Sequence, residues 1–221
     1  MSNQMHRIRF RDFDARKFSF QRHPILVLDE FWSPQELIRW RQAMEQQRWT
    51  PLSAMPDVAR AFPNCGNWEK ANLAGADASL LMQRVSLPCI AEYVESFPDI
   101  TGRHVSFNYY SYGAGDCLPT HDDTDDAYAV PGAVRPARRL ALVTYFHSEW
   151  EPDWGGELLI YEPQRPGGSK KPRLSLTHSI QPEPGSLVIF SVPRWHRVAR
   201  VDQLAGTNKR LSIAGWFMTQ H

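Results

Sequence analysis

The order of apolar patterns along the chain predicts a mainly β fold with flanking helices. From residue 103 onward, at least seven short runs rich in β-branched and aromatic residues follow one another, separated by Gly and Pro turns. Before that point, two stretches carry apolar residues at helical spacing instead. This order favours two sheets folded over one another, a double-stranded β-helix of the jelly-roll or cupin-like type, with the N-terminal helices packed on one sheet.

Length and composition favour one domain. The 221 residues suit a strand and helical support region at 1–102 followed by a jelly-roll core at 103–221. A formal net charge of +1 gives no bulk attraction to nucleic acid or to a membrane surface. The three cysteines lack a Cys-x-x-Cys pair, and no apolar run is long enough to suggest a leader or a membrane span. We therefore expect a cytoplasmic protein without nucleic-acid or membrane partners, and the sequence leaves the oligomeric state open.

The first strand and helix have clear signals. The apolar run HPILVLDEF, 23–31, predicts a strand. Ser33 can then cap a helix, Pro34 suits its first position, and Glu36 completes a capping box. Apolar residues recur at helical spacing after this start and predict a face packed against a sheet: Leu37, Trp40 and Met44.

Two further segments complete the N-terminal region. Residues 50–77 contain three Pro and two Gly with little periodicity, so we expect a long irregular segment of the kind that often covers a functional site. Residues 77–97 have helical spacing and predict a second helix, which is kinked or interrupted near Pro88.

The predicted strands of the core are HVSFNYYSY, RLALVTYFH, GELLIYE, RLSLTHSI, SLVIF, HRVARV and RLSIAGWFM. Residues 163–173, rich in Pro, Gly and Lys, predict an exposed hairpin loop. Segment 124–137 begins with acidic residues and ends with Pro and Gly, which fits either a loop that covers a substrate or a solvated connection.

A His-x-Asp pattern stands at the end of one predicted strand. On a pleat, His121 and Asp123 would point to the same side and converge on a cation, while Asp122 would point away. His196 follows the run SLVIF and supplies a third ligand if the two strands lie side by side. Two histidines and one carboxylate leave positions open on an octahedral metal, as in non-haem Fe(II) oxygenases. By itself the pattern also occurs by chance in many chains.

Four blocks in order then resemble the prolyl-4-hydroxylase-like branch of the 2-oxoglutarate/Fe(II)-dependent dioxygenases, over residues 109–217. YGAGDCLPTHDD resembles the pattern Tyr-x-x-Gly-Asp-x-Leu-x-x-His-x-Asp of that family. RRLALVTYFHSEWEPDWGGELLIYEP resembles its stretch from Arg-Leu-Thr through Tyr-Leu-Asn to Gly-Gly-Glu-Leu. IQPEPGSLVIF resembles Pro-x-x-Gly-x-Leu-x-x-Phe, and WHRVARV with RLSIAGWF supplies the distal His, Arg-x-Ser and closing Trp.

The resemblance implies three iron ligands: His121, Asp123 and His196. It also implies that Arg210 binds the distal carboxylate of 2-oxoglutarate, and Ser212, on the same strand face, can donate a further hydrogen bond. Tyr145 matches a tyrosine that binds this carboxylate in several relatives, and Tyr112 matches an aromatic residue that lines the site. Either tyrosine can instead be an ordinary core residue with a satisfied hydroxyl.

As the resemblance implies, the cofactors are Fe(II), 2-oxoglutarate as cosubstrate and O2, and the family allows ascorbate as a reductant. The implied activity is hydroxylation of an unactivated C–H bond in an amino acid, a peptide or protein residue such as prolyl, or a small natural product, with release of succinate and CO2. The partner is then a small-molecule, peptide or protein substrate. The alternatives are a catalytically silent protein or a non-oxygenase, cupin-like metal-binding or sensor protein on the same fold.

The sequence departs from the family at His147, where relatives have the Asn of Tyr-Leu-Asn. His147 is either a substrate contact or a loop residue, and we favour the loop. A substrate carboxylate would account for basic residues near the motifs, although exposed arginines are usually just solvated: Arg138, Arg194 and Arg197. Substrate choice is expected to lie in segments 50–77 and 124–137 and in Arg194–Trp195.

Overall fold

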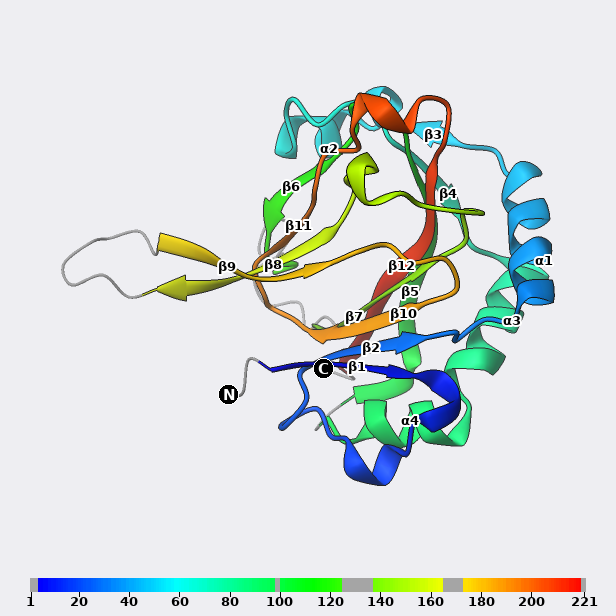
Figure 1. Ribbon diagram of the computed structural model, residues 1–221, viewed down its shortest axis with the longest axis vertical. Helices are drawn as coiled ribbons and strands as arrows, with labels where there is room; N and C mark the ends of the chain where they lie inside the picture. Colours follow the sequence, from blue (N-terminus) through cyan, green and yellow to red (C-terminus); the bar gives the residue numbers. More distant parts are fainter. Residues whose placement is uncertain (1–3, 98–99, 125–136, 165–172, 220–221) are drawn as a thin grey trace, which may run out of the picture.

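The computed structural model describes residues 4–97, 100–124, 137–164 and 173–219 (Figure 1). In these ranges the strands form two sheets. The larger sheet has the order β1 (Met5–Arg9), β2 (Ile25–Asp29), β10 (Leu187–Ser191), β7 (Arg138–Tyr145), β12 (Arg210–Thr219), β5 (Ile100–Tyr112), β4 (Glu69–Asn72), β3 (Thr50–Pro51). The smaller sheet has the order β6 (Leu118–His121), β11 (His196–Val198), β8 (Leu158–Gln164), β9 (Arg173–Ile180). This double-sheet arrangement confirms the predicted fold class.

The helices are short and lie N-terminal to β5: α1 (Pro34–Glu45), α2 (Pro56–Ala61), α3 (Gly75–Val85) and α4 (Pro88–Glu95). The predicted capping box is confirmed, because Ser33 accepts from the Glu36 N–H and Glu36 accepts from the Ser33 N–H. Pro88 begins α4, so the predicted interruption separates two helices. None of the helices among the described residues is long and apolar enough to cross a membrane.

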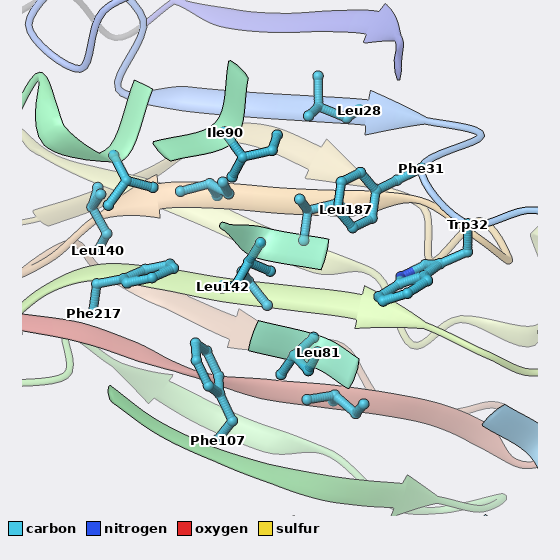
Figure 2. Close-up of a cluster of buried hydrophobic side chains, with 14 of the residues drawn as sticks. Leu28, Phe31, Trp32, Leu81, Ile90, Phe107, Leu140, Leu142, Leu187 and Phe217 are labelled. Atoms are coloured by element: carbon cyan, nitrogen blue, oxygen red, sulfur yellow. The ribbon is translucent and has the colours of Figure 1, made fainter. Parts of the chain in front are cut away.

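The core forms between the helices and one face of the larger sheet. Trp40 and Met44 of α1 are buried there, as their spacing predicts. Figure 2 shows Leu81 of α3 and Ile90 of α4 beside strand residues that point to the same side, including Leu142. Side chains alternate along a strand, so the intervening residues face the smaller sheet and form a second cluster with Leu158, Ile160 and Ile180. The larger sheet is therefore covered on both faces.

Segment 50–77 is more regular than predicted, and the expectation of an irregular segment was wrong in part. It contains β3, α2 and β4, and β4 adds to the edge of β5 with Lys70 paired to Tyr110. A strand of four residues, three of them polar, is too short to show a periodic signal, and it forms because β5 supplies its backbone hydrogen bonds. The predicted β8–β9 hairpin is confirmed by the pairing of Gln164 with Arg173. Residues 165–172 of its loop, and 125–136 of the predicted 124–137 loop, lie outside the described residues. The division into 1–102 and 103–221 stays a prediction.

Candidate active site

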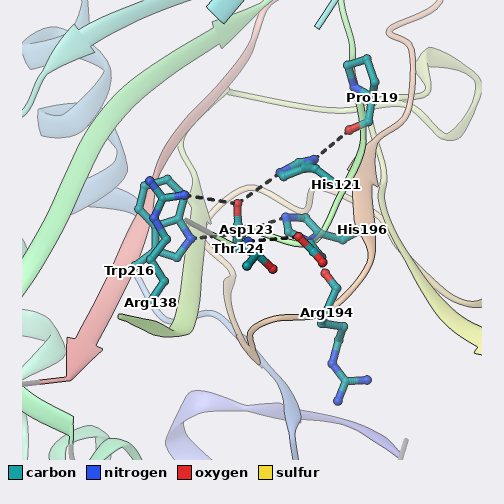
Figure 3. A network of polar contacts seen from close by, with 9 residues as sticks. Pro119, His121, Asp123, Thr124, Arg138, Arg194, His196 and Trp216 are labelled. Carbon is teal, nitrogen blue, oxygen red and sulfur yellow. Dashed lines mark hydrogen bonds and ion pairs between the residues drawn. The ribbon is translucent and has the colours of Figure 1, made fainter. Parts of the chain in front are cut away.

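Three potential metal ligands converge at one end of the smaller sheet. β11 pairs with β6 so that His196 lies opposite His121, and their ring centroids are 4.2 Å apart. The Asp123 carboxylate lies 3.3 Å from Nε2 of His121 and 3.5 Å from Nε2 of His196. One ligand atom from each residue lies within 4.8 Å of the other two. Figure 3 shows the three side chains turned toward one another.

A turn brings Asp123 to the histidines, so the predicted pleat geometry was wrong. β6 ends at His121, and Asp123 has a left-handed backbone with φ of 63°. Asp tolerates this conformation. The Asp122 carboxylate accepts the backbone N–H of Thr124 at 3.0 Å, and this Asx turn closes over Asp123. Strand alternation therefore does not set the direction of Asp122. The run SLVIF, which precedes His196, also does not lie beside the strand of His121. It forms β10 in the larger sheet, and it is β11, which begins at His196, that pairs with β6.

Hydrogen bonds to the far side of each ring fix the histidine tautomers. Nδ1 of His121 lies 2.7 Å from the Pro119 carbonyl oxygen, and Nδ1 of His196 lies 2.7 Å from that of Arg194. A carbonyl oxygen can only accept, so each Nδ1 carries the proton and each Nε2 presents a lone pair to Asp123. Two lone pairs and a carboxylate that face one another are stable together when a cation lies between them. This donor set therefore fits a divalent metal such as Fe(II).

The electrostatics keep these groups in the forms that bind metal. Burial alone would raise the pKa of the Asp123 carboxyl, but a protonated imidazole at His121 or His196 and the indole N–H of Trp216, which donates to Asp123 at 2.7 Å, hold it below its usual range. Burial, together with the nearby His121, lowers the pKa of His196 to about 4. At neutral pH the site thus offers an ionised carboxylate and a neutral His196 imidazole.

Arg210 lies at the other end of the same inner face. It begins β12, is 2% exposed, and donates to uncharged groups: Gly156 O at 2.7 Å, Ser212 Oγ at 3.4 Å and the Tyr145 hydroxyl at 3.4 Å. Its Cζ lies 5.5 Å from the centroid of the Tyr112 ring. No ion pair among the described residues includes Arg210, and burying a cation without a counterion is costly. The two-pronged guanidinium group of Arg210 therefore fits a carboxylate ligand such as that of 2-oxoglutarate.

A cavity of about 370 Å³ joins the two ends. The residues proposed from the sequence that line it are His121, Asp123, His196, Arg210, Ser212 and Tyr112. Tyr145 does not line the cavity, but its hydroxyl contacts Arg210. Segment 50–77 forms one wall through residues that include Met55, Phe62 and Lys70, as expected of a segment that covers a site. Sequence reasoning gave no functional role to Lys70 or Trp216. Trp216 stands six residues after Arg210, an even spacing that places both on one strand face, whereas nothing local marks Lys70.

Three other basic residues considered from the sequence lie outside the cavity lining. The Arg194 guanidinium points away from the metal ligands (Figure 3), and it donates to Ser191 and pairs with Glu162. Arg197 is partly buried and does not line the cavity. His147 follows β7 as a connecting residue, but it is 4% exposed and bonds the Pro182 carbonyl at 2.6 Å. Of the arginines expected to meet a substrate, Arg138 alone among the described residues lines this cavity.

His147 predicts a pH dependence of stability. Burial lowers its pKa from 6.5 to about 4, so the unfolded chain takes up a proton between these pH values while the folded chain does not. Lowering the pH from 7.5 to 5 should therefore cost about 2 kcal/mol of unfolding free energy through this residue. His147→Asn removes the titrating group and should lose about 2 kcal/mol less than wild type over that range, measured by urea unfolding of metal-free protein. Equal losses in both proteins would contradict this role of His147.

Comparison with known proteins agrees with this geometry. Residues 106–218, just over half of the chain, match the family model of the 2OG-Fe(II) oxygenase superfamily. A mouse protein named prolyl 3-hydroxylase OGFOD1 is 32% identical over 108 residues, which are 48% of this chain but only 17% of that protein's length.

The solved structures confirm the fold. A Pseudomonas putida prolyl-4-hydroxylase superposes with a TM-score of 0.60 at 18% identity, covering 90% of this chain and 95% of that one. A prolyl hydroxylase from Trichoplax adhaerens, in complex with a hypoxia inducible factor peptide fragment, superposes with a TM-score of 0.59 at 16% identity, covering 95% and 89%. The family match, the fold and the converging ligands lead to one conclusion: the chain belongs to the 2OG-Fe(II) oxygenase superfamily, whose reaction uses Fe(II), 2-oxoglutarate and O2.

Proposed function

We propose that the protein hydroxylates an unactivated C–H bond in an amino acid, a peptide or protein residue such as prolyl, or a small natural product, releasing succinate and CO2. The observation that carries the proposal is one cavity with a two-histidine, one-carboxylate cluster at one end and a buried arginine at the other. His121, Asp123 and His196 would hold Fe(II), and Arg210 would bind the distal carboxylate of 2-oxoglutarate.

The chain's own residues bind the cosubstrate, orient the metal ligands and exclude water from the site. Bound Fe(II) and 2-oxoglutarate supply the activation of O2. Arg210 offers its planar fork to the carboxylate, and the hydroxyls of Ser212 and Tyr145, which accept from Arg210, keep their own protons to donate to the same group. The Trp216 N–H holds one Asp123 oxygen in place. Phe62, whose ring lies 5.5 Å from that of His121, closes the metal end with an apolar surface that excludes water.

A peptide or protein residue is supported as one substrate class by the relatives. The Trichoplax adhaerens structure holds a peptide, and the mouse relative is named a prolyl 3-hydroxylase. Because the chain spans so little of the mouse protein, only the matched core carries this argument. Arg210 argues against a metal-binding sensor or a non-oxygenase cupin, since neither needs a buried guanidinium at the far end of the cavity that holds the metal ligands.

The proposal is tested with purified protein, Fe(II), 2-oxoglutarate and ¹⁸O-labelled O2, offered free amino acids in one set of reactions and capped peptides in another. We expect one set to yield a product that has gained a single labelled oxygen atom, detected by mass spectrometry, with succinate formed in equal amount. His121→Ala should form neither. Hydroxylated product that persists without 2-oxoglutarate, or no oxygenated product in either set, would contradict the proposed function.

A further inference from the structure

Two buried cysteines lie where one wall of the cavity meets the chain that leads to the first metal ligand. Cys65 follows α2 in segment 50–77, which forms that wall, and Cys117 stands directly before β6. Their exposed fractions are 1% and 5%, and both belong to one apolar cluster with Trp68 and Tyr112 of the cavity lining. The proposed hydroxylation uses neither thiol.

A backbone hydrogen bond holds the two cysteines side by side. The Cys117 N–H donates to the Cys65 carbonyl oxygen at 3.0 Å. Residues joined by such a bond have Cα atoms about 5–6 Å apart. This is the separation that a disulfide spans. Burial raises the pKa of the Cys65 thiol, and the nearby Cys117 raises it further, so the side chains as well as the backbones are close together.

Asp116 fixes the same junction from the side of Cys117. Its carboxylate accepts the backbone N–H of Asn67 and that of Gly113, each at 2.7 Å. Gly66 has a left-handed backbone with φ of 83°, and a Cβ atom at this position would clash with the Asp116 side chain. The segments that carry the two cysteines therefore pack directly on one another.

The junction lies at the surface, although the two thiols are buried. The residues on both sides of Cys65 are exposed: 63, 64, 66 and 67. Arg200, which is also exposed, bridges the two segments by donating to the carbonyl oxygens of Asn64 and Gly115. Because buried thiols react slowly, a reagent reaches Cys65 through local opening of this exposed stretch.

We propose that Cys65 and Cys117 form a reversible disulfide by exchange with a small disulfide such as glutathione disulfide. One cysteine thiolate attacks the small disulfide and expels one thiolate, and the second cysteine then attacks the mixed disulfide and expels the other. The two cysteine protons pass to the two released thiolates. The cysteines are thus oxidised while the small disulfide is reduced to two thiols, and no further oxidant is required.

This disulfide would fasten the cavity wall beside the metal ligands. Phe62 precedes Cys65 by three residues, His121 follows Cys117 by four, and the rings of Phe62 and His121 lie 5.5 Å apart. In the reduced protein the Cys65 thiol donates to the Phe62 carbonyl oxygen at 2.9 Å. The disulfide replaces this hydrogen bond within one segment by a covalent link between two segments. We therefore expect it to limit movement of the wall away from β6.

The test maps the disulfides of folded protein after equilibration under argon with glutathione and glutathione disulfide at fixed ratios. Remaining thiols are blocked, and peptides are identified by mass spectrometry without reduction. The reference is the same equilibration in guanidinium chloride, where all three cysteines are free to pair. We expect one main intramolecular link, between Cys65 and Cys117, favoured at least about tenfold in the folded protein over that reference.

Single substitutions separate this pair from the third cysteine. Cys65→Ser and Cys117→Ser should each abolish the link and leave the remaining cysteine of the pair as a mixed disulfide with glutathione. Cys89→Ser is the matched control, because Cys89 lies on α4 and packs against the core cluster between the helices and the larger sheet. That variant should form the 65–117 link to the same extent as wild type.

Hydrogen exchange tests whether the link fastens the wall. Backbone amides of residues 52–68 should exchange at least about threefold more slowly in the disulfide form than in the reduced protein. Those of β9, at the opposite edge of the smaller sheet from β6, should not change. The inference is overturned by a link no more frequent in folded protein than in guanidinium chloride, by links that mainly include Cys89, or by unchanged exchange of 52–68 in the disulfide form.

Discussion

Replacing Arg210 with methionine is expected to weaken 2-oxoglutarate binding by about 100-fold or more. The variant removes Arg210, the buried cation that the described residues place at that end of the cavity, and leaves the hydroxyls of Ser212 and Tyr145 there as donors to a carboxylate. Loss of a charged partner from a buried, hydrogen-bonded pair typically costs 2–5 kcal/mol. The measurement is anaerobic calorimetry of 2-oxoglutarate binding to the Fe(II)-loaded protein.

A second variant and a separate measurement of Fe(II) binding serve as controls for Arg210→Met. Arg210→Lys keeps the charge without the fork and should fall between wild type and Arg210→Met. Fe(II) binding, measured separately, should persist in both variants if they fold, because the metal ligands come from β6, its following turn and β11. Wild-type affinity for 2-oxoglutarate in folded Arg210→Met would show that another group holds the cosubstrate.

Replacing Asp123 with alanine is expected to abolish measurable Fe(II) binding and all turnover. Two neutral imidazoles would remain, and the cluster would lose its only negative charge among the three ligands. Trp216 would also lose the acceptor of its N–H. The measurement is the metal content of protein dialysed against Fe(II) under argon, together with succinate formation.

Asp122→Asn is the matched control for Asp123→Ala. It removes a negative charge one position away but keeps a side-chain oxygen to accept from Thr124, so the turn that positions Asp123 should persist. Fe(II) content should stay near that of wild type in this variant. Equal metal loss in Asp122→Asn and Asp123→Ala would mean that general negative charge, rather than coordination by Asp123, holds the metal.

Much of the site could be predicted from the sequence, because the motifs that contain its residues are short and continuous in the chain. Arg210 and Ser212 could be placed together because alternation along one strand puts them on the same face, which β12 confirms. The fold class followed from runs of β-formers, each of which became a strand. The same alternation rule failed at Asp123, because the strand ends at His121 and an Asx turn takes over.

The features that sequence reasoning missed depend on long-range contacts. β4 is a strand because it pairs with β5, some forty residues later, so its four residues, three of them polar, show no pattern of their own. Lys70 enters the cavity through that pairing. His147 is buried, with the Pro182 carbonyl and the Trp150 ring against its imidazole, and its position after a strand could not indicate these contacts. Arg194 looks like a substrate contact in sequence, yet its partner Glu162 comes from β8.

The most direct test of the account is Fe(II)-dependent conversion of 2-oxoglutarate to succinate by the purified protein in air, compared with His121→Ala and Arg210→Met. We predict succinate formation that requires added Fe(II) and is lost in both variants. The contradictory result is succinate formation that survives both substitutions, or wild-type protein that neither forms succinate nor binds 2-oxoglutarate in the presence of Fe(II).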